Sequence, residues 1–242
     1  MNRLICSFVL GVGLTTVTFA QESQQSQAQR AVGNNMRNEQ RMATGDLLDQ
    51  KYNERDLSTD SLIDAYNRAR RFNDCAAHSG RKRQAQLLST KPGSRAEQVA
   101  ADKLMGRYES CARNFGNIPV RFLRGSAAEV LAEKFITSDG LLSSLSLESL
   151  EARVPEAADD NDETMTFLKA LAECQVSQSA HAVRTLLAKS VSVGIMENAE
   201  KELSQATSAC GDGLGDNAVT NLLHRSFLAE AFYFSQVSEK DD

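Results

Sequence analysis

The chain has 242 residues, with 27 Lys and Arg against 32 Asp and Glu and no Trp, and its net charge is −5. That charge, without aromatic residues beside the arginines to stack on bases, argues against nucleic acid as a partner. Past residue 20 no stretch approaches the roughly 20 consecutive apolar residues of a transmembrane helix, so a membrane-spanning protein is not expected.

Residues 1–20 have the order of a secretory signal peptide. Arg3 precedes an apolar run from Leu4 to Leu14, and the small residue Ala20 ends the segment. The run is too short for a membrane span, although a retained N-terminal anchor is the alternative. We expect Cys6 to be removed with the peptide and the mature protein to be periplasmic or secreted.

Residues 21–58 form a polar leader that is dominated by Gln, Asn, Ser, Arg and Glu. Between residues 21 and 40 the only aliphatic or sulfur-bearing side chains beyond alanine are Val32 and Met36. Such a segment buries too little apolar surface to offset the entropy of ordering it, so we predict that it is disordered.

The rest of the chain predicts an all-α fold, because it is rich in Ala, Leu, Glu, Lys, Arg and Gln and β-branched residues do not alternate with polar ones. We predict a first, basic module at 59–137, an acidic linker at 138–161 with one short helix before Pro155, and a second, acidic module at 162–242. Each module should hold four helices, at 59–75, 80–90, 94–114 and 120–136, and at 162–175, 179–190, 194–209 and 217–237. Ser94 and Glu97 form a capping box.

The two modules are predicted to be copies of one unit. A shift of 99 places Cys75 and Cys111 on Cys174 and Cys210, and it also aligns the apolar stripes of the third helices. Beyond the following turn the shift becomes 101 and places Arg124, Ala128 and Glu129 on Arg225, Ala229 and Glu230. This self-similarity is typical of a tandem duplication.

Four cysteines remain after export, which favours disulfides in an oxidising compartment. Three connectivities are possible for four cysteines. In each module the first cysteine ends helix one and the second ends helix three, and these ends lie on the same side of an up-down bundle. We therefore predict the bonds Cys75–Cys111 and Cys174–Cys210. The alternatives are a metal site or a redox pair, and both usually use CxxC-type spacing, which is absent.

Arg124 and Arg225 each precede a glutamate, Glu129 or Glu230, by five residues. On a helix this spacing separates the two side chains by about 140°, so they do not pair within their own helix. Each arginine either binds a ligand or is structural, bound to helix-end carbonyls or to an acid on a neighbouring helix. We favour the structural interpretation, because residues repeated in a duplicated module usually serve the fold.

Motifs for catalysis, metals or cofactors are not found. His78, His181 and His224 lack metal-ligand spacing and are interpreted as surface or helix-end residues, and Ser126 as an ordinary helix serine. The acidic run at 156–163 and the group Asp212, Asp216 and Asn217 allow weak calcium binding, but helix-start carboxylates explain them better. We predict no catalytic residue, no metal and no cofactor.

The charges divide unevenly between the halves. Residues 59–137 hold 14 Lys and Arg against 8 Asp and Glu, whereas residues 138–242 hold 7 against 18. The basic module, with Arg70, Arg71, Arg81 and Arg83, could dock on the acidic half, self-associate, or bind an acidic partner of the cell envelope. Solvated faces without a partner are the alternative interpretation.

The first module resembles a helical module found in a group of uncharacterised exported bacterial proteins. The residues that carry the resemblance are Cys75, Leu87, Leu88, Pro92, Gly93, Ser94, Cys111, Leu123, Arg124, Gly125, Ala128, Glu129 and Leu131. The second module keeps Cys174, Leu186, Leu187, Cys210, Arg225, Ala229 and Glu230 but lacks the Pro-Gly-Ser turn. The resemblance implies export and a helical fold, and it implies no activity.

These patterns favour an exported helical protein with a non-enzymatic binding or structural role in the periplasm or envelope. The alternative is a hydrolase or lyase that acts on envelope polymers, with a site between the modules. A pocket that joins Arg124 or Arg225 to a close carboxylate pair would favour the enzyme.

Overall fold

The computed structural model describes residues 58–112, 118–137, 142, 145–156, 163–211, 214 and 218–237, and these residues contain helices and no strand. The all-α prediction is therefore confirmed for this part of the chain. The predicted signal peptide and all of the polar leader except Ser58 lie outside the described residues.

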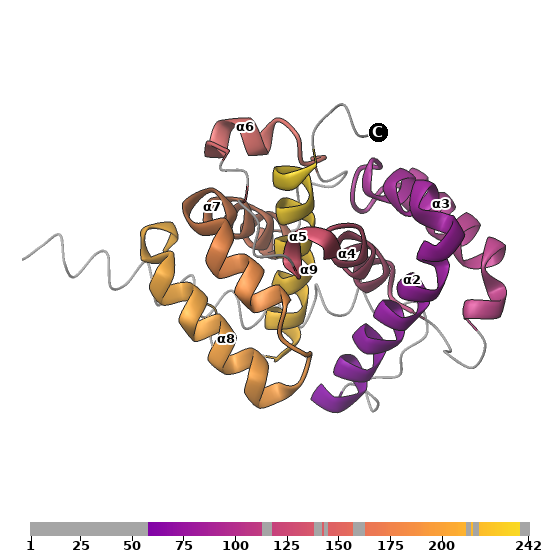
Figure 1. The fold of residues 1–242 in the computed structure, drawn as a ribbon, viewed down its shortest axis with the longest axis horizontal. Helices are drawn as coiled ribbons and strands as arrows, with labels where there is room; N and C mark the ends of the chain where they lie inside the picture. Colours follow the sequence, from indigo (N-terminus) through magenta and orange to yellow (C-terminus); the bar gives the residue numbers. More distant parts are fainter. Residues whose placement is uncertain are drawn as a thin grey trace, which may run out of the picture. The chain divides into compact units, whose positions relative to one another are not determined.

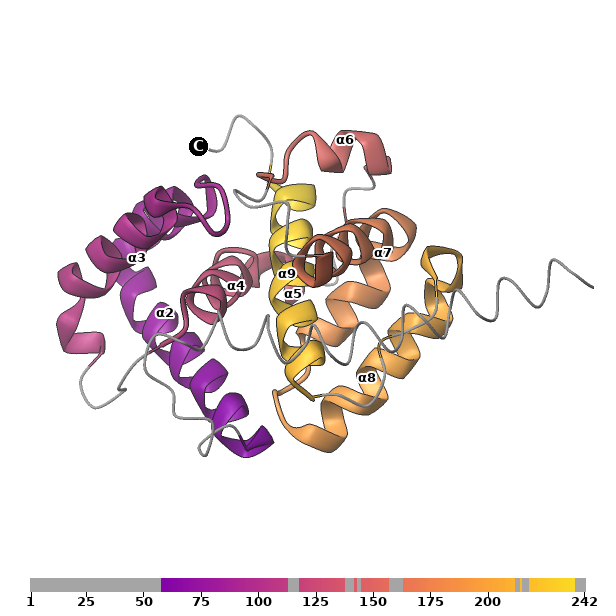
Figure 2. The ribbon, with the colours of Figure 1, turned by 180° about the vertical axis from the view of Figure 1, so that it is seen from behind.

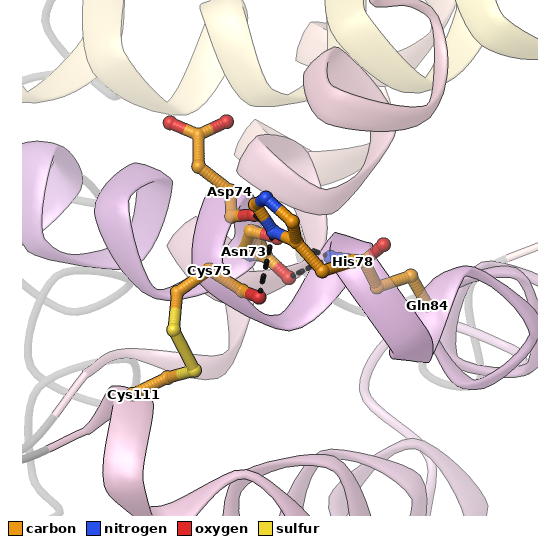
Figure 3. Close-up of a disulfide and its surroundings, with 6 residues drawn as sticks. All are labelled: Asn73, Asp74, Cys75, His78, Gln84 and Cys111. Atoms are coloured by element: carbon orange, nitrogen blue, oxygen red, sulfur yellow. Dashed lines mark hydrogen bonds between the residues drawn. A yellow bond between two sulfur atoms is a disulfide. The ribbon is translucent and has the colours of Figure 1, made fainter.

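The helix α2 (Thr59–Leu88) is continuous where two helices were predicted, at 59–75 and 80–90. Ser58 caps its start, because the Ser58 side chain accepts a hydrogen bond from the Ser61 amide. The Gln84 amide nevertheless donates to the Asn73 carbonyl at 2.8 Å (Figure 3). Eleven residues of a straight helix would separate these groups by about 16 Å, so α2 must bend between them. The prediction that the helix is interrupted between residues 75 and 80 is therefore wrong, but the helix bends in this region.

Tyr108 packs against this bend. Its hydroxyl donates to the Ser79 carbonyl at 2.9 Å, and a Cβ added to Gly80 would lie 2.8 Å from the Tyr108 ring. Gly80 is thus needed for the close approach of the ring, which explains why a residue that reads as a helix breaker lies inside a helix.

The third predicted helix of the first half is shorter than expected. It comprises α3 (Arg95–Arg107) and the 3₁₀ turn η2 (Glu109–Cys111). Ser94 caps α3 by accepting from the Glu97 amide at 3.1 Å, and the Glu97 carboxylate accepts from the Gly93 amide at 2.7 Å. The capping arrangement predicted for Ser94 and Glu97 is present, with the carboxylate bound one residue before the N-cap.

The next predicted helix, at 120–136, divides at Ala132 into α4 (Val120–Leu131) and α5 (Glu133–Ile136). The short linker helix predicted before Pro155 is present as α6 (Leu147–Glu151). Ser146 caps α6 by accepting from the Ser149 amide.

The second half repeats this order of elements with α7 (Glu163–Leu187), α8 (Val193–Ala206), the 3₁₀ turn η3 (Ser208–Cys210) and α9 (Ala218–Gln236). Here the predicted break is visible, since α7 kinks at Ser179, where φ is −153° and ψ is 78°. The Ser179 hydroxyl caps the following segment by accepting from the Ala182 amide.

The helices α4 and α9 lie at the centre of the described part of the chain (Figures 1 and 2). α2 packs on α4, α7 packs on α9, and α4 packs on α9, while α3 and α8 lie against α2 and α7. All residues from Arg121 to Leu131 and from Thr220 to Tyr233 are buried. One apolar cluster includes side chains of both halves, so the core runs through the α4–α9 contact.

One disulfide lies within each half, and both pairings are as predicted, although Cys75 and Cys174 lie inside α2 and α7 and do not end a helix. Cys75 is bonded to Cys111 and Cys174 to Cys210, with Cα–Cα distances of 5.8 and 5.7 Å. Figure 3 shows the first bond, which joins Cys75 of α2 to Cys111 of η2. Each bond closes a loop of the same length, which the chain-entropy account values at about 4 kcal/mol of stabilisation.

Candidate functional site

The contact between α4 and α9 is close enough to bring the two backbones together. A Cβ added to Gly125 would lie 2.5 Å from the Cβ and 2.6 Å from the Cα of Ser226. Only glycine fits at this point, and the small side chain of Ser226 bonds back to the Leu222 carbonyl at 3.1 Å. Side chains of the two helices on either side of this point can therefore reach each other directly.

Two arginine–glutamate pairs flank this crossing and connect the halves reciprocally. Arg124 Nε donates to Glu230 Oε2 at 2.6 Å, and Arg225 Nε donates to Glu129 Oε1 at 2.7 Å. Each arginine thus binds the acid of the opposite half. Because Arg and Glu within one helix point about 140° apart, each pair can form only across the crossing.

The remaining guanidinium nitrogens bind the ends of two outer helices. Arg124 donates to the Leu87 and Leu88 carbonyls at the end of α2, at 2.8 and 2.7 Å. Arg225 donates to the corresponding carbonyls at the end of α7, those of Leu186 and Leu187, at 3.2 and 2.8 Å. The last carbonyls of a helix lack intrahelical donors, and the planar fork of an arginine can satisfy several of them. Each arginine therefore joins three helices.

The two glutamates have further partners that differ between the halves. Glu129 accepts from the Tyr66 hydroxyl at 2.7 Å and from Arg70 at 2.6 Å. Glu230 is paired with Arg121, whose guanidinium lies 3.9 Å from the centre of the Phe227 ring. In both halves the buried glutamate is bound by two arginines. A buried charge is stable only when such charged donors compensate for the loss of water.

Electrostatics keep Glu129 ionised. Burial by itself would raise the pKa of its carboxyl, but the cations Arg225 and Arg70 lower that pKa below its ordinary value. The same burial, together with the negative charge of Glu129, raises the pKa of Tyr66 well above its ordinary value. Tyr66 therefore stays protonated and serves as a hydrogen-bond donor.

None of the four paired groups is accessible to a ligand in this conformation. The exposed fractions are 0% for Arg124, 3% for Arg225 and 1% for each of Glu129 and Glu230. Their donors are directed at carboxylates and helix-end carbonyls. These contacts support the structural interpretation of both arginines. Each arginine binds helix-end carbonyls and also an acid on a neighbouring helix.

The other residues considered from the sequence occupy varied places. Ser126 lies in the core, where its hydroxyl donates to the Phe122 carbonyl at 2.7 Å and accepts from Asn73 at 2.8 Å. His78 and His181 are exposed. The interpretation of His224 as a surface or helix-end residue is wrong, because it is fully buried and its Nδ1 lies 3.2 Å from both carboxylate oxygens of Glu200. The apolar residues Leu222, Leu223 and Phe227 around it were the available signal.

Two of the basic residues that could dock on the acidic half, Arg70 and Arg81, contact their own half. Arg70 pairs with Asp74, Glu129 and Glu133, all in the first half. Arg81 donates to the Val130 carbonyl at 3.3 Å. These contacts do not support the docking alternative for these two arginines.

The surface has an open depression of about 790 Å³ between the end of α7 and α8. It is lined by Lys189, Ser190, Ile195, Asn198, Lys201, Glu202 and Gln205. Behind it a narrow gap, too tight for a water molecule, reaches Met196, Glu200 and Arg225. This depression is the candidate binding site within the described residues, and the sequence analysis missed it.

The described residues form neither a metal-binding cluster nor a membrane-spanning helix. No group of three or more His, Cys, Asp or Glu that could hold a metal ion occurs in the described ranges. The candidate calcium residues Asp159, Asp160, Asp162, Asp212, Asp216 and Asn217 lie outside those ranges. No described helix combines the length and the apolar character that crossing a membrane requires.

No protein-family model, curated protein or solved structure matches this chain.

Proposed function

We propose that this chain is an exported protein of the periplasm or envelope with a binding or structural role and no enzymatic activity. The observation that carries the proposal is the use of its repeated charged residues. Arg124, Arg225, Glu129 and Glu230 are buried and paired with one another, so they hold helices together and do not face a substrate.

We further propose that the protein consists of two tandem helical modules. The supporting observation is that each half forms the same set of contacts: a disulfide across 36 residues, a bent or kinked first helix, and an arginine on the last two leucine carbonyls of that helix. Unrelated helical hairpins would not share all of these contacts with shifts as similar as 99 residues for the cysteines and leucines and 101 for the arginines.

Export is supported by the N-terminal sequence pattern and by the disulfides. Arg3 and the apolar run after it have the order of a signal peptide. Two disulfides persist in oxidising compartments and are rare in the reducing cytosol.

The alternative of a hydrolase or lyase receives no support from the described residues. It required a pocket that joins Arg124 or Arg225 to a close carboxylate pair. The gap that reaches Arg225 admits no water, and Arg124 is fully buried. The hydrolysis of a polymer needs a place for both water and substrate, so we do not adopt this alternative.

The partner is proposed to be acidic and to bind the basic first half. Arg81 and Lys82 are exposed on α2, and Lys103 and Arg107 are exposed on α3. Exposed cations with few local acids favour an acidic envelope component or a second copy of the chain whose acidic half meets this surface.

The test is capture of partners from native periplasm by tagged wild-type protein and by a variant with Arg81, Lys82, Lys103 and Arg107 changed to Ser. We expect a stoichiometric partner that the variant loses, identified by mass spectrometry. In parallel, purified protein is incubated with isolated envelope polymers, and soluble fragments are measured. Fragment release that follows the protein through purification would overturn the non-enzymatic proposal.

A further inference from the structure

The two buried arginines differ on the side that faces α3 or α8. Arg124 Nη1 has a second carboxylate partner, Glu97 Oε1 at 3.4 Å, and it also donates to Thr90 Oγ1 at 3.1 Å. Arg225 has neither, and it donates instead to the Lys189 carbonyl at 3.1 Å. The shift of 99 residues explains the difference, because it places Glu97 on Met196 and Thr90 on Lys189.

Glu97 has a defined place in the first half. It lies in the first turn of α3, is almost fully buried, and connects the Gly93 amide to Arg124. Met196 lies in the first turn of α8 and is buried to the same degree. The second half therefore has a thioether where the first half has a carboxylate, and no described side chain replaces that carboxylate at Arg225.

The open depression leads to this place. Lys189, Ser190 and Ile195 line both the depression and the narrow gap, and Met196 and Arg225 line the gap. Methionine is flexible and unbranched, so its side chain can move aside at small cost. Displacing Met196 would connect the solvent to the guanidinium of Arg225.

The rim of the depression matches a short peptide. From Ile195 to Gln205 it follows α8 for about 15 Å, the length of four or five extended residues. Asn198 and Gln205 provide amides for peptide groups, and Lys201 provides positive charge. Glu202 at the rim pairs with Lys189 at 2.7 Å, and Glu200 faces His224.

We propose that this depression binds an acidic peptide segment of a partner protein and that one ligand carboxylate displaces Met196 to reach Arg225. The ligand carboxylate takes the place that Glu97 has in the first half. A charged donor bound to a carboxylate is among the stronger hydrogen bonds in proteins. This inference rests on the proposed binding function, and it adds a second site, in the second half, to the basic surface proposed for the first half.

The probe is the peptide acetyl-Ala-Glu-Ala-Glu-Ala-amide, titrated by calorimetry into the disulfide-bonded mature chain, with the Gln-for-Glu peptide as its control. We expect the acidic peptide to bind at least about tenfold more tightly than the Gln peptide, a difference of about 1.4 kcal/mol. Equal binding of the two peptides would overturn the proposal. Equal binding of acetyl-glutamate amide would overturn the peptide assignment in favour of a small organic acid.

The decisive variant is Met196→Glu, which installs the carboxylate of the first half. We expect it to fold, to raise the melting temperature and to abolish peptide binding. The control is Val99→Glu, which adds the same charge at an exposed position of α3 and should leave binding unchanged. If Met196→Glu does not fold, Lys201→Glu on the exposed rim must abolish binding instead. Retained affinity in either folded variant would exclude the site.

The two proposals can fail separately. If the acidic peptide does not bind but a partner is still captured through the basic surface of the first half, the site is wrong and the binding function stands. If no partner is captured and envelope polymers are cleaved, the binding function fails, whatever the peptide titration shows.

Discussion

The side chains at the α4–α9 crossing carry charges that water does not reach. Removing one member of such a pair takes a charged partner from a group that water cannot reach, and the loss of a buried pair costs about 3–5 kcal/mol. A buried ion pair therefore adds little net stability to the fold, but the fold is destabilised when either partner is lost. For Arg124 and Arg225 the partner in question is the glutamate of the other half.

We predict that Arg124→Met lowers the free energy of unfolding by about 3–5 kcal/mol, measured by urea denaturation. Its effect should be strongly non-additive with Glu230→Gln, because Arg124 Nε contacts Glu230 at 2.6 Å. Glu129→Gln is the matched control, since Glu129 is on the same helix as Arg124 and pairs with Arg225. Equal coupling of Arg124 to the two acids would contradict the reciprocal pairing.

The acid dependence of stability should be dominated by Glu129. Its pKa is below the ordinary value in the folded protein, because the cations Arg225 and Arg70 outweigh the opposing effect of burial. The stabilisation is therefore present above the unfolded pKa of about 4.3 and is lost as pH falls through the lower folded value. We expect Glu129→Gln to make the free energy of unfolding less steep below about pH 4.5.

Glu173 is a control, because its pKa shift has the opposite direction to that of Glu129. Burial raises the pKa of its carboxyl despite the Lys169 ammonium at 2.6 Å. Its ionisation in the folded protein therefore costs stability as pH rises through and above the unfolded value. Glu173→Gln should remove that loss and leave the acid limb intact. A Glu173→Gln profile that resembles that of Glu129→Gln would refute the assignment.

The packing of α4 against α9 requires their backbones to approach closely at Gly125 and Ser226. We predict that Gly125→Ala destabilises the protein by about 1–3 kcal/mol, because its Cβ would overlap Ser226. Gly106→Ala on α3 is the matched control: nothing lies within 4 Å of the added methyl group. There alanine should stabilise the helix by about 0.5–1 kcal/mol. Thermal denaturation of both variants distinguishes packing from helix propensity.

The elements also show how far the sequence could lead. The apolar periodicity predicted helices, equal cysteine spacing predicted both disulfides, and Ser94 with Glu97 predicted a capped start. The continuity of α2 was not predictable, because Gly80 reads as a breaker unless the Tyr108 ring beside it is known.

The candidate sites also depend on contacts between distant segments, which the sequence could predict only in part. The 140° separation of Arg124 and Glu129 predicted that they do not pair with each other. A repeat cannot show which copy supplies a partner, so the exchange of acids between halves was not predictable. The burial of His224 and the depression along α8 depend on how α8 packs on α7 and α9, which local patterns do not contain.

For the whole molecule, the shared core predicts that the two halves unfold together. The contact between them consists of buried apolar side chains and ion pairs from which water is excluded, and salt screens such pairs much less than exposed ones. We therefore expect small-angle scattering profiles of the mature chain to agree at 0.1 M and 1 M salt. Denaturation followed in each half should give one coincident transition. An extended particle at high salt would show that the halves are held by surface charge.

The exchange of acids also determines how changes at these positions can be tolerated. A substitution of Arg124 removes one of the two described cations that pair with the acid at position 230, about a hundred residues away in the other half. A compensating substitution must therefore arise in the other half. The central helices α4 and α9 can change at these positions only as a pair.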